Sequence, residues 1–349
     1  MTPANIQTLV YAKRRRAHSG YSSRLGHNRK WTIRMRILFC GDTFPAARRE
    51  LERTLAPDQD EIVVCEAGSI IPALDAVDVL IPLMCRIDRA VMEAGHFRLI
   101  QQWGAGLEGI DLAAAQERGI AVANVPATGS NADSVAELAI LLTIALLRNL
   151  PAAQANVRAG RLGAPQGRML ASRTVCLYGL GAIAQALAKR LRAFDVRLLG
   201  ITRDPHAPKV ADFKLDACYS LTGRDACLAQ TDVLILCARL SRENQGSIDA
   251  TALTALRPGA CVVNAARGAL IDYDALYAAL ASGHLSGAGL DVYWSEPISP
   301  GDPLLALPNV IATPHIAGVT DRSYREIADA VAANINRLRT GGILQNTAF

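Results

Sequence analysis

The sequence of 349 residues predicts an α/β protein of two domains, each with a parallel sheet covered by helices on both faces. Three observations lead to this prediction. Short apolar runs alternate with segments of helical periodicity along most of the chain. A glycine-rich turn joins an apolar run to a helical segment at 179–181. The length suits about two ordinary domains, and 50% of the residues are hydrophobic, enough for a large core.

The strands are predicted from apolar runs bounded by turn residues, and the helices from apolar residues spaced three or four apart. The predicted strands are 35–40, 61–65, 77–82, 99–103, 119–125, 174–178, 196–201, 233–237, 261–264, 287–292 and 310–313. The predicted helices are 46–55, 88–94, 112–118, 134–149, 182–194, 224–229, 250–256, 273–282 and 320–340.

The helix predicted at 134–149 is apolar nearly all round, so we expect it to be buried on more than one face. Asn131 or Asp133 is expected to cap it, and Pro151 to end it. Packing under another domain and a subunit contact would together bury this surface. The polar, glycine-rich segment 154–167 is predicted to be a link.

The net charge of +5 comes from the N-terminus. Residues 1–34 carry eight basic residues and no acid, which leaves 29 basic and 32 acidic residues in the rest of the chain. We expect 1–34 to be a disordered basic extension or the product of an upstream start. The alternative is an arm for nucleic acid or a membrane.

The eight cysteines form no Cys-x-x-Cys pair, and several fall in predicted core strands, which favours reduced, buried thiols. We predict no metal site. No uncharged apolar run reaches the ~18 residues of a membrane span, and the N-terminus lacks an apolar signal core. We therefore expect a cytoplasmic protein without a membrane or nucleic-acid partner.

The turn at 179–181 lies between a predicted strand and a predicted helix, inside a strand–helix–strand unit. Gly179 can adopt a tight turn, Gly181 lets the main chain approach a phosphate, and Ala184 lets the helix lie against the strand. The helix N-terminus would then present free N–H groups to a pyrophosphate. This pattern predicts a dinucleotide site; the alternative is a purely structural turn.

Chemically reactive side chains follow three successive strands. Arg267 follows the first, Asp291 and Glu296 follow the second, and His315 follows the third. Each alone could be a solvated surface group, a turn residue or an ordinary histidine. Ligands bind beyond the carboxyl ends of parallel strands, so we expect the four side chains to face a nicotinamide.

Together they supply what carbonyl reduction needs. A cation polarises the carbonyl and binds an adjacent carboxylate, and an imidazole donates a proton to the nascent alkoxide. We predict that Glu296 is the carboxylate beside His315. The glycine-rich loop 103–111 has backbone N–H groups suited to a carboxylate, with a simple turn as the alternative.

The combination of these motifs resembles the D-isomer-specific 2-hydroxyacid dehydrogenases, in particular the glyoxylate/hydroxypyruvate reductase type. The resemblance runs from Met35 to the C-terminus. The motifs that carry it are Gly179-Leu-Gly181-Ala-Ile-Ala184, Asn264-Ala-Ala-Arg267-Gly268, Asp291-Val292, Glu296-Pro297, Pro314-His315-Ile-Ala-Gly318, the loop 103–111 and Ser134-Val-Ala-Glu137.

The resemblance implies a Rossmann nucleotide-binding domain (127–316) inserted into a flavodoxin-like substrate domain (35–126 with 317–349). It implies catalysis by Arg267, Glu296 and His315, and substrate binding by Ala105, Gly106 and Arg267. It also implies a homodimer through 134–149 and domain closure over the substrate. The implied cofactor-binding residues are Gly179, Gly181, Ala182, Ile183, Thr202, Arg203, Cys237, Ala265 and Asp291.

The choice of cofactor depends on the end of the second nucleotide strand. An acid there binds the ribose 2′-hydroxyl of NAD(H), whereas an arginine accommodates the 2′-phosphate of NADP(H). Thr202 stands at that position, followed by Arg203, which favours NADP(H). Asp204 would favour NAD(H) if the loop were shifted by one or two residues.

The sequence leaves the individual 2-oxo or 2-hydroxy acid and the physiological direction open. The loop 83–86 with Trp103 and Trp294 is expected to line the substrate pocket, which suggests a modest, non-phosphorylated acid. Arg86 in this loop leaves a phosphorylated substrate as the alternative. Two alternatives remain: a non-catalytic, dinucleotide-sensing protein of the corepressor type, and a phosphoglycerate or formate dehydrogenase of the same fold.

Overall fold

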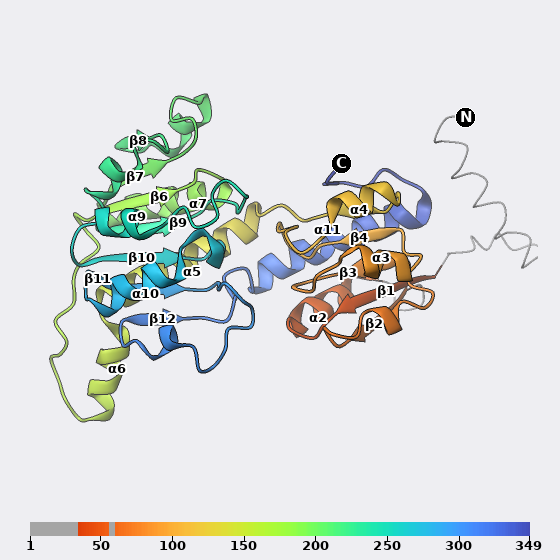
Figure 1. The fold of residues 1–349 in the computed structure, drawn as a ribbon, viewed down its shortest axis with the longest axis horizontal. Helices are drawn as coiled ribbons and strands as arrows, with labels where there is room; N and C mark the ends of the chain where they lie inside the picture. Colours follow the sequence, from red (N-terminus) through yellow and green to blue (C-terminus); the bar gives the residue numbers. More distant parts are fainter. Residues whose placement is uncertain (1–33, 56–59) are drawn as a thin grey trace, which may run out of the picture. The chain divides into compact units, whose positions relative to one another are not determined.

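The computed structural model describes residues 34–55 and 60–349, which contain two separate, wholly parallel sheets with helices between the strands (Figure 1). The predicted α/β class is confirmed. The predicted basic extension, apart from Arg34, lies outside the described residues.

The first sheet has the strand order β2-β1-β3-β4-β5. Its strands are β1 (Met35–Cys40), β2 (Asp60–Cys65), β3 (Val79–Ile81), β4 (Leu99–Gln101) and β5 (Ala121–Ala123). The helices of this part are α2 (Pro45–Thr54), α3 (Arg89–Ala94), α4 (Leu112–Glu117), the C-terminal α11 (Asp321–Thr340) and the 3-10 turn η1 (Ile71–Ala73).

The second sheet has the order β12-β11-β10-β9-β6-β7-β8. Its strands are β6 (Thr174–Tyr178), β7 (Arg197–Ile201), β8 (Ala217–Tyr219), β9 (Val233–Leu236), β10 (Ala260–Asn264), β11 (Leu285–Leu290) and β12 (Val310–Ala312). Its helices are α5 (Gly129–Leu147), α6 (Leu150–Arg158), α7 (Ala182–Leu191), α8 (Arg224–Leu228), α9 (Ala250–Ala255) and α10 (Tyr273–Ala281). Its 3-10 turns are η2 (Arg192–Phe194), η3 (Pro208–Phe213), η4 (Gly268–Leu270) and η5 (Pro303–Ala306).

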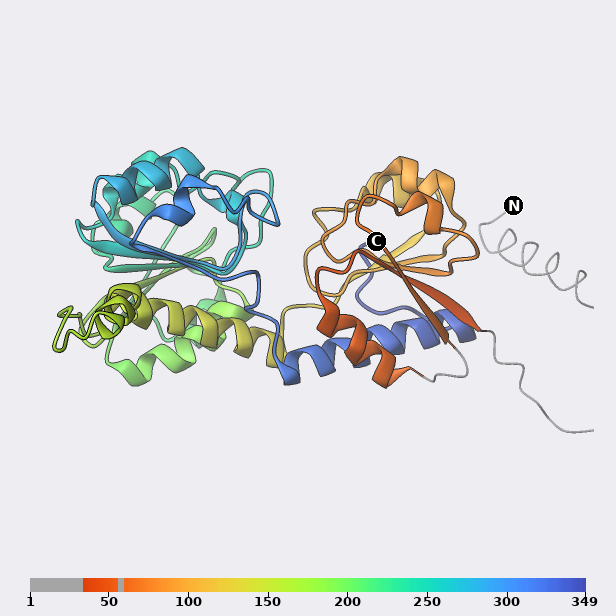
Figure 2. The ribbon, with the colours of Figure 1, turned by 90° about the horizontal axis from the view of Figure 1, so that it is seen from below.

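Helices cover both faces of each sheet (Figure 2). In β6, Val175 and Leu177 pack into the apolar cluster that contains α5 and α7, whereas Cys176 and Tyr178 pack into the cluster that contains α8, α9 and α10. Successive residues of this strand are therefore buried on opposite faces. This burial explains why the central strands read as continuous apolar runs.

Helix α5 differs from the prediction at both ends. It begins at Gly129, and its N-cap Thr128 makes no side-chain capping bond, so the caps predicted at Asn131 and Asp133 are wrong. Asn131 instead donates to Ser323 Oγ at 3.0 Å, and Asp133 pairs with Arg190 at 2.8 Å. Both side chains are therefore engaged with other helices and do not cap α5.

The region after α5 also differs. Pro151 does not end α5 but lies in the first turn of α6, after Asn149 turns the chain with φ +46°. The predicted link 154–167 is therefore helical in its first part. Strand β8, three residues at the edge of the sheet, was not predicted because so short a run carries little periodicity.

Of the described residues, only α5 forms a helix long and apolar enough to suit a membrane span by length and composition. Half of the 18-residue apolar window of this helix is buried within the protein. All eight cysteines have free thiols, and five of them are buried.

Candidate active site

A cleft of about 450 Å³ collects the carboxyl ends of strands from both sheets. Residues that follow β3 and β4 line one side, among them Leu83, Met84 and Trp103. Residues that follow β6, β9 and β10 line the other, among them Ile183 and Cys237. The carboxyl ends of parallel strands are the expected place for ligands in α/β proteins.

The glycine turn has the geometry that a dinucleotide site requires. Gly179 has φ +93°, and a Cβ there would lie 2.6 Å from Cα of Ala238, so no side chain fits. Gly181 forms the N-cap of α7 without a side-chain capping bond, and nothing lies within 4 Å of the place of its missing Cβ. The first N–H groups of α7 thus have no side-chain cap, and an anion can approach them.

Most of the other predicted cofactor residues lie near this turn. Ala182, Ile183, Cys237 and Ala265 line the cleft beside Gly181. Sheet order explains this placement, because β6 lies between β7 and β9 and the topology switches there. The turn, the end of β9 and the end of β10 therefore meet at one edge.

Thr202 and Arg203 follow β7, outside the cleft lining. Thr202 N–H donates to Tyr219 O at 3.0 Å, which joins this segment to β8. Asp204 Oδ1 accepts the N–H of His206 at 3.0 Å, so its carboxylate is engaged in its own loop. Arg203 is exposed, with no ion-pair partner among the described residues.

Arg267 lies on a rigid turn after β10. The buried Asn264 side chain donates to Arg267 O at 2.9 Å and accepts the N–H of Ala266 at 3.0 Å. A Cβ at Gly268 would overlap the backbone of Tyr293 and Trp294. Asn264 was not predicted to have a role, although a polar residue at the end of an apolar strand in the motif Asn264-Ala-Ala-Arg267-Gly268 indicates one.

The guanidinium of Arg267 reaches the glycine-rich loop that follows β4. Its Nη1 donates to Ala266 O at 2.7 Å, and its Nε lies 3.4 Å from Glu108 Oε1. A Cβ at Gly106 would overlap Arg267 Nη2 and Glu108 Oε2. Glu108 was not predicted to have a role, because nothing in the spacing of the sequence places it near Arg267.

Ala105 and Gly106 present unused backbone donors. Among the described residues, neither N–H donates to a protein acceptor. The loop is fixed on its other side, since Ala105 O accepts Asn124 Nδ2 at 2.8 Å and Gly104 O accepts Val125 N–H at 3.1 Å. Two free N–H groups beside a guanidinium can hold a carboxylate.

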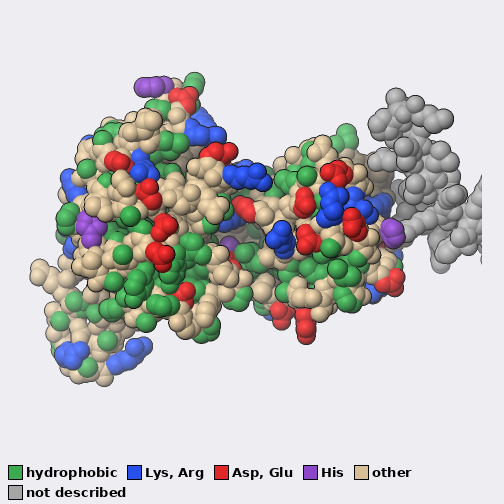
Figure 3. Space-filling model, in the orientation of Figure 1, with side chains coloured by type: hydrophobic (Ala, Val, Ile, Leu, Met, Phe, Trp, Pro, Cys, Tyr) green, Lys and Arg blue, Asp and Glu red, His purple; other side chains and the backbone are tan. Residues whose placement is uncertain are grey.

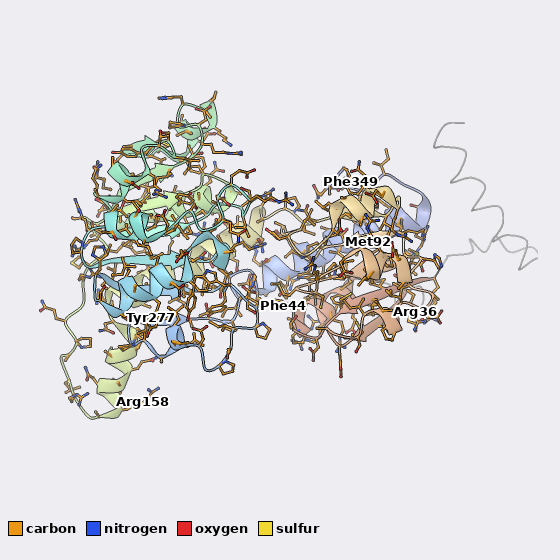
Figure 4. All side chains as sticks on the ribbon, in the orientation of Figure 1. Arg36, Phe44, Met92, Arg158, Tyr277 and Phe349 are labelled. Carbon is orange, nitrogen blue, oxygen red and sulfur yellow. The ribbon has the colours of Figure 1, made fainter. Side chains whose placement is uncertain are left out.

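Glu296 lies beside His315, as the sequence predicts. His315 Nδ1 donates to Glu296 Oε2 at 2.5 Å, and the other carboxylate oxygen accepts the N–H of Tyr293 at 2.9 Å. This leaves Nε2 of His315, a residue of the cleft lining, without a protein partner in the described part of the chain. Phe44, which is labelled in Figure 4, packs edge-on against the imidazole with ring centroids 5.8 Å apart.

Burial by itself would raise the pKa of Glu296. The hydrogen bond and the charge of His315, with the N–H of Tyr293 and the charge of Arg267, together outweigh burial, so the pKa of Glu296 lies below its ordinary value. Glu296 therefore stays ionised and can accept the Nδ1–H of His315.

Asp291 holds the loop that carries His315. It is fully buried and accepts hydrogen bonds from Thr313 Oγ1 at 2.6 Å, Ile316 N–H at 2.8 Å and Ala317 N–H at 2.8 Å. Burial raises the pKa of Asp291, and these hydrogen bonds offset only part of the rise.

This support matters because His315 has φ +53°, a conformation that side chains other than glycine rarely adopt. The sequence predicts a cofactor contact for Asp291. Its contacts in the structure give it a positioning role for His315.

Only some of the residues predicted to line the substrate pocket line the cleft in the structure. Leu83, Met84 and Trp103 line the cleft, and Tyr324 of α11 packs edge-on against Trp103 with centroids 5.6 Å apart. Trp294 does not line it, because its indole N–H donates to Ile271 O at 2.7 Å and its ring packs on Tyr273. Phe44 and Tyr324 were missed, since each comes from an element distant in sequence from the others.

Two arginines in the loop after β9 were also not predicted to belong to the site. Arg239 lines the cleft after β9, and Arg242 follows in the same exposed loop.

In the described part of the chain, no group of three or more His, Cys, Asp or Glu residues is arranged to hold a metal ion.

The known proteins that this chain resembles point to one family. A family model described as D-isomer specific 2-hydroxyacid dehydrogenase, NAD binding domain, matches residues 140–317. A D-3-phosphoglycerate dehydrogenase of Archaeoglobus fulgidus is 34% identical over 79% of this chain, but the match covers only 51% of that protein. The chain thus spans about half the length of the phosphoglycerate dehydrogenases that it matches.

Relatives of similar length show comparable identity. A hydroxypyruvate reductase of Thermotoga maritima is 34% identical over 80% of this chain and 88% of its own length. The crystal structure of an NADPH-dependent glyoxylate/hydroxypyruvate reductase of Sinorhizobium meliloti, in complex with NADP and malonate, matches with a TM-score of 0.77. It is 31% identical, with 90% of this chain and 97% of that chain covered.

Proposed function

The chain belongs to the D-isomer specific 2-hydroxyacid dehydrogenase family, and from this premise we propose that it interconverts a small 2-oxo acid and its 2-hydroxy acid with NADP(H). The observation that carries the proposal is the contact of 2.5 Å between Glu296 and His315 in the same cleft as Arg267 and the glycine turn. A proton donor, a carboxylate-binding cation and a dinucleotide turn are the parts that the reaction needs.

The residues fit a nicotinamide dinucleotide. The turn at Gly179 and Gly181 has room for a pyrophosphate at the N-terminus of α7, and Ile183, Cys237 and Ala265 would line the way to the nicotinamide. When bound, the reduced cofactor supplies the hydride.

The chain's own side chains do the remaining work. Arg267, with the N–H groups of Ala105 and Gly106, binds the substrate carboxylate and turns the carbonyl toward the cofactor. Arg267 also polarises the carbonyl oxygen, and Nε2 of His315 donates the proton that this oxygen needs. Glu296 stabilises the imidazolium, and Phe44 shields one side of the ring from water.

A panel of 2-oxo acids with NADPH and NADH tests the proposal. Glyoxylate and hydroxypyruvate are expected to be the better substrates, because the apolar side chains of Leu83, Trp103 and Tyr324 in the cleft lining suit a small, non-phosphorylated acid. Oxidation of NADPH is the readout. Binding of NADPH without turnover of any acid would support the dinucleotide-sensing alternative instead.

The preference for NADP(H) is supported by arginines at the ends of β7 and β9. Strands β7 and β9 lie on either side of β6, so the segments that follow them, with the exposed Arg203 and Arg242, begin at the same edge of the sheet as the glycine turn. We assign the 2′-phosphate to Thr202 and Arg203, with Arg242 adding positive potential.

Replacing Arg203 by Ala is expected to raise the KM for NADPH at least ~10-fold and to leave the KM for NADH nearly unchanged, since a hydrogen bond to a charged group contributes about 1.5–3 kcal/mol. Asp204→Asn is the matched control, because Asp204 is engaged with His206. An unchanged KM for NADPH in Arg203→Ala would contradict the assignment, as would a wild-type enzyme that prefers NADH.

The Glu296→Gln variant tests the proton-transfer pair. Despite its burial, the hydrogen bond and charge of His315 lower the pKa of Glu296, so in the wild type the imidazole is held by an ionised carboxylate. A neutral amide at this position binds the Nδ1–H less strongly, so kcat/KM for oxidation of a 2-hydroxy acid is expected to fall about 10-fold, while the affinity for the cofactor is unchanged. An unchanged kcat/KM would show that the pair does not support proton transfer.

We also propose that two chains associate through α5 and the adjoining segment 150–169, which we call the arm. Leu141 of α5 is exposed, and so are four apolar side chains of the arm: Leu150, Val157, Leu162 and Met169. Figure 3 shows hydrophobic side chains in green on the part of the surface that α6 forms, at the lower left. Light scattering is expected to give twice the mass of one chain. Val157→Glu is expected to dissociate the dimer, and a monomeric wild-type protein would reject the proposal.

A further inference from the structure

We propose that Glu108 is an internal ligand of Arg267, which occupies the subsite of the substrate carboxylate until the substrate displaces it. This inference rests on the proposed function, because that function defines the subsite. It gives Glu108 a role in setting substrate affinity that is separate from hydride transfer and from proton transfer.

The position of the Glu108 carboxylate carries the proposal. Oε1 lies 3.4 Å from Arg267 Nε, and Oε2 lies over the α-carbon of Gly106, where a Cβ would overlap it. The same Cβ would overlap Arg267 Nη2. A carboxylate of the protein therefore lies between the guanidinium and the loop whose two N–H groups are free, which is the place expected for a substrate carboxylate.

The backbones on both sides of this contact are fixed. The loop of Glu108 is anchored by Ile87 N–H to Gly109 O at 2.9 Å and Asp111 N–H to Ile87 O at 3.0 Å. The turn of Arg267 is held by the side chain of Asn264. Displacement of Glu108 therefore does not require either backbone to move.

The Glu108 side chain itself is free to leave. Its contact with Arg267 is its only ion pair among the described residues, and the side chain is 42% exposed. A glutamate has several rotatable bonds and can turn toward water. Arg267 stays in place when it does, because its Nη1 remains bonded to Ala266 O.

Two consequences follow for the substrate. A 2-oxo acid must replace an existing ion pair, so its apparent affinity is reduced. The displaced carboxylate also remains tethered in the cleft, so a second negative charge on the substrate is repelled. This internal carboxylate therefore favours monoanionic acids over phosphorylated ones.

The test is the Glu108→Gln variant, with oxamate as a monoanionic probe. Calorimetry on the complex with NADPH is expected to show oxamate bound about 5- to 10-fold more tightly than by the wild type. The KM for glyoxylate is expected to fall, and the ratio of kcat/KM for 3-phosphohydroxypyruvate to that for glyoxylate is expected to rise. Glu108→Asp, whose shorter side chain keeps the charge, should bind oxamate less tightly than Glu108→Gln.

Glu117→Gln is the control, because Glu117 pairs with Arg89 at 2.7 Å in an exposed ion pair of α4 with α3. It removes one negative charge without entering the cleft, and wild-type oxamate affinity is expected. Unchanged or weaker oxamate binding by Glu108→Gln overturns the inference, because Glu108 would then support Arg267 rather than compete with the ligand. Oxamate binding needs no turnover, so an inactive wild type would reject the proposed function separately.

Discussion

The His315→Asn variant is expected to lose about 10³-fold in kcat for reduction of a 2-oxo acid, within the range for removal of a positioned general acid. Asn tolerates the left-handed conformation that His315 adopts, so the loop held by Asp291 should keep its shape. The loss then reports the missing proton donor rather than a displaced loop. The measurement is kcat with saturating NADPH, together with the Kd of NADPH, which should stay within about twofold.

His96→Asn is the matched control for this variant. His96 is exposed and lies in the segment between α3 and β4, away from the cleft lining. Its replacement should leave kcat unchanged. A His315→Asn enzyme with wild-type kcat would show that the proton comes from another group, and the proposed mechanism would fail.

The Arg267→Gln variant is expected to lose about 10³-fold in kcat/KM, because both the carboxylate and the carbonyl oxygen of the substrate lose a charged hydrogen-bond donor. Arg267→Lys should recover only a small part, because an ammonium cannot reproduce the planar fork of the guanidinium. Affinity for NADPH should be retained in both variants. Initial rates over a range of glyoxylate concentrations give the ratio.

Arg89→Gln provides the control for loss of an arginine, since Arg89 pairs with Glu117 in an exposed ion pair. It is expected to keep the wild-type kcat/KM. If Arg267→Gln raised KM without lowering kcat, the guanidinium would bind the substrate but not stabilise its transition state.

Much of the site could be predicted because its chemistry is local in sequence. The glycine turn, the Arg267 turn and the His315 loop each follow their own strand within a few residues. Parallel strands end at one edge of a sheet, and β10, β11 and β12 are neighbours in it. The contact between Glu296 and His315 follows from that arrangement, and it was predicted.

The predictions that were wrong concern side chains whose role was inferred from neighbours in sequence but is set by contacts with residues farther away in the chain. Asn131 and Asp133 have the chemistry of helix caps, but Ser323 and Arg190 hold their side chains inside α5. Trp294 lies near Glu296 in sequence but is fixed to Ile271 instead.

The sequence alone determined the alternation of strand and helix, the dinucleotide turn, and the set of cation, acid and imidazole, because each is encoded by residues close together in the chain. Only the tertiary structure decided that Phe44 packs against His315 and that Glu108 lies on Arg267. Those pairs join residues far apart in sequence, whose meeting depends on how loops from the two sheets approach one another. No periodicity or spacing within a single segment records such an approach.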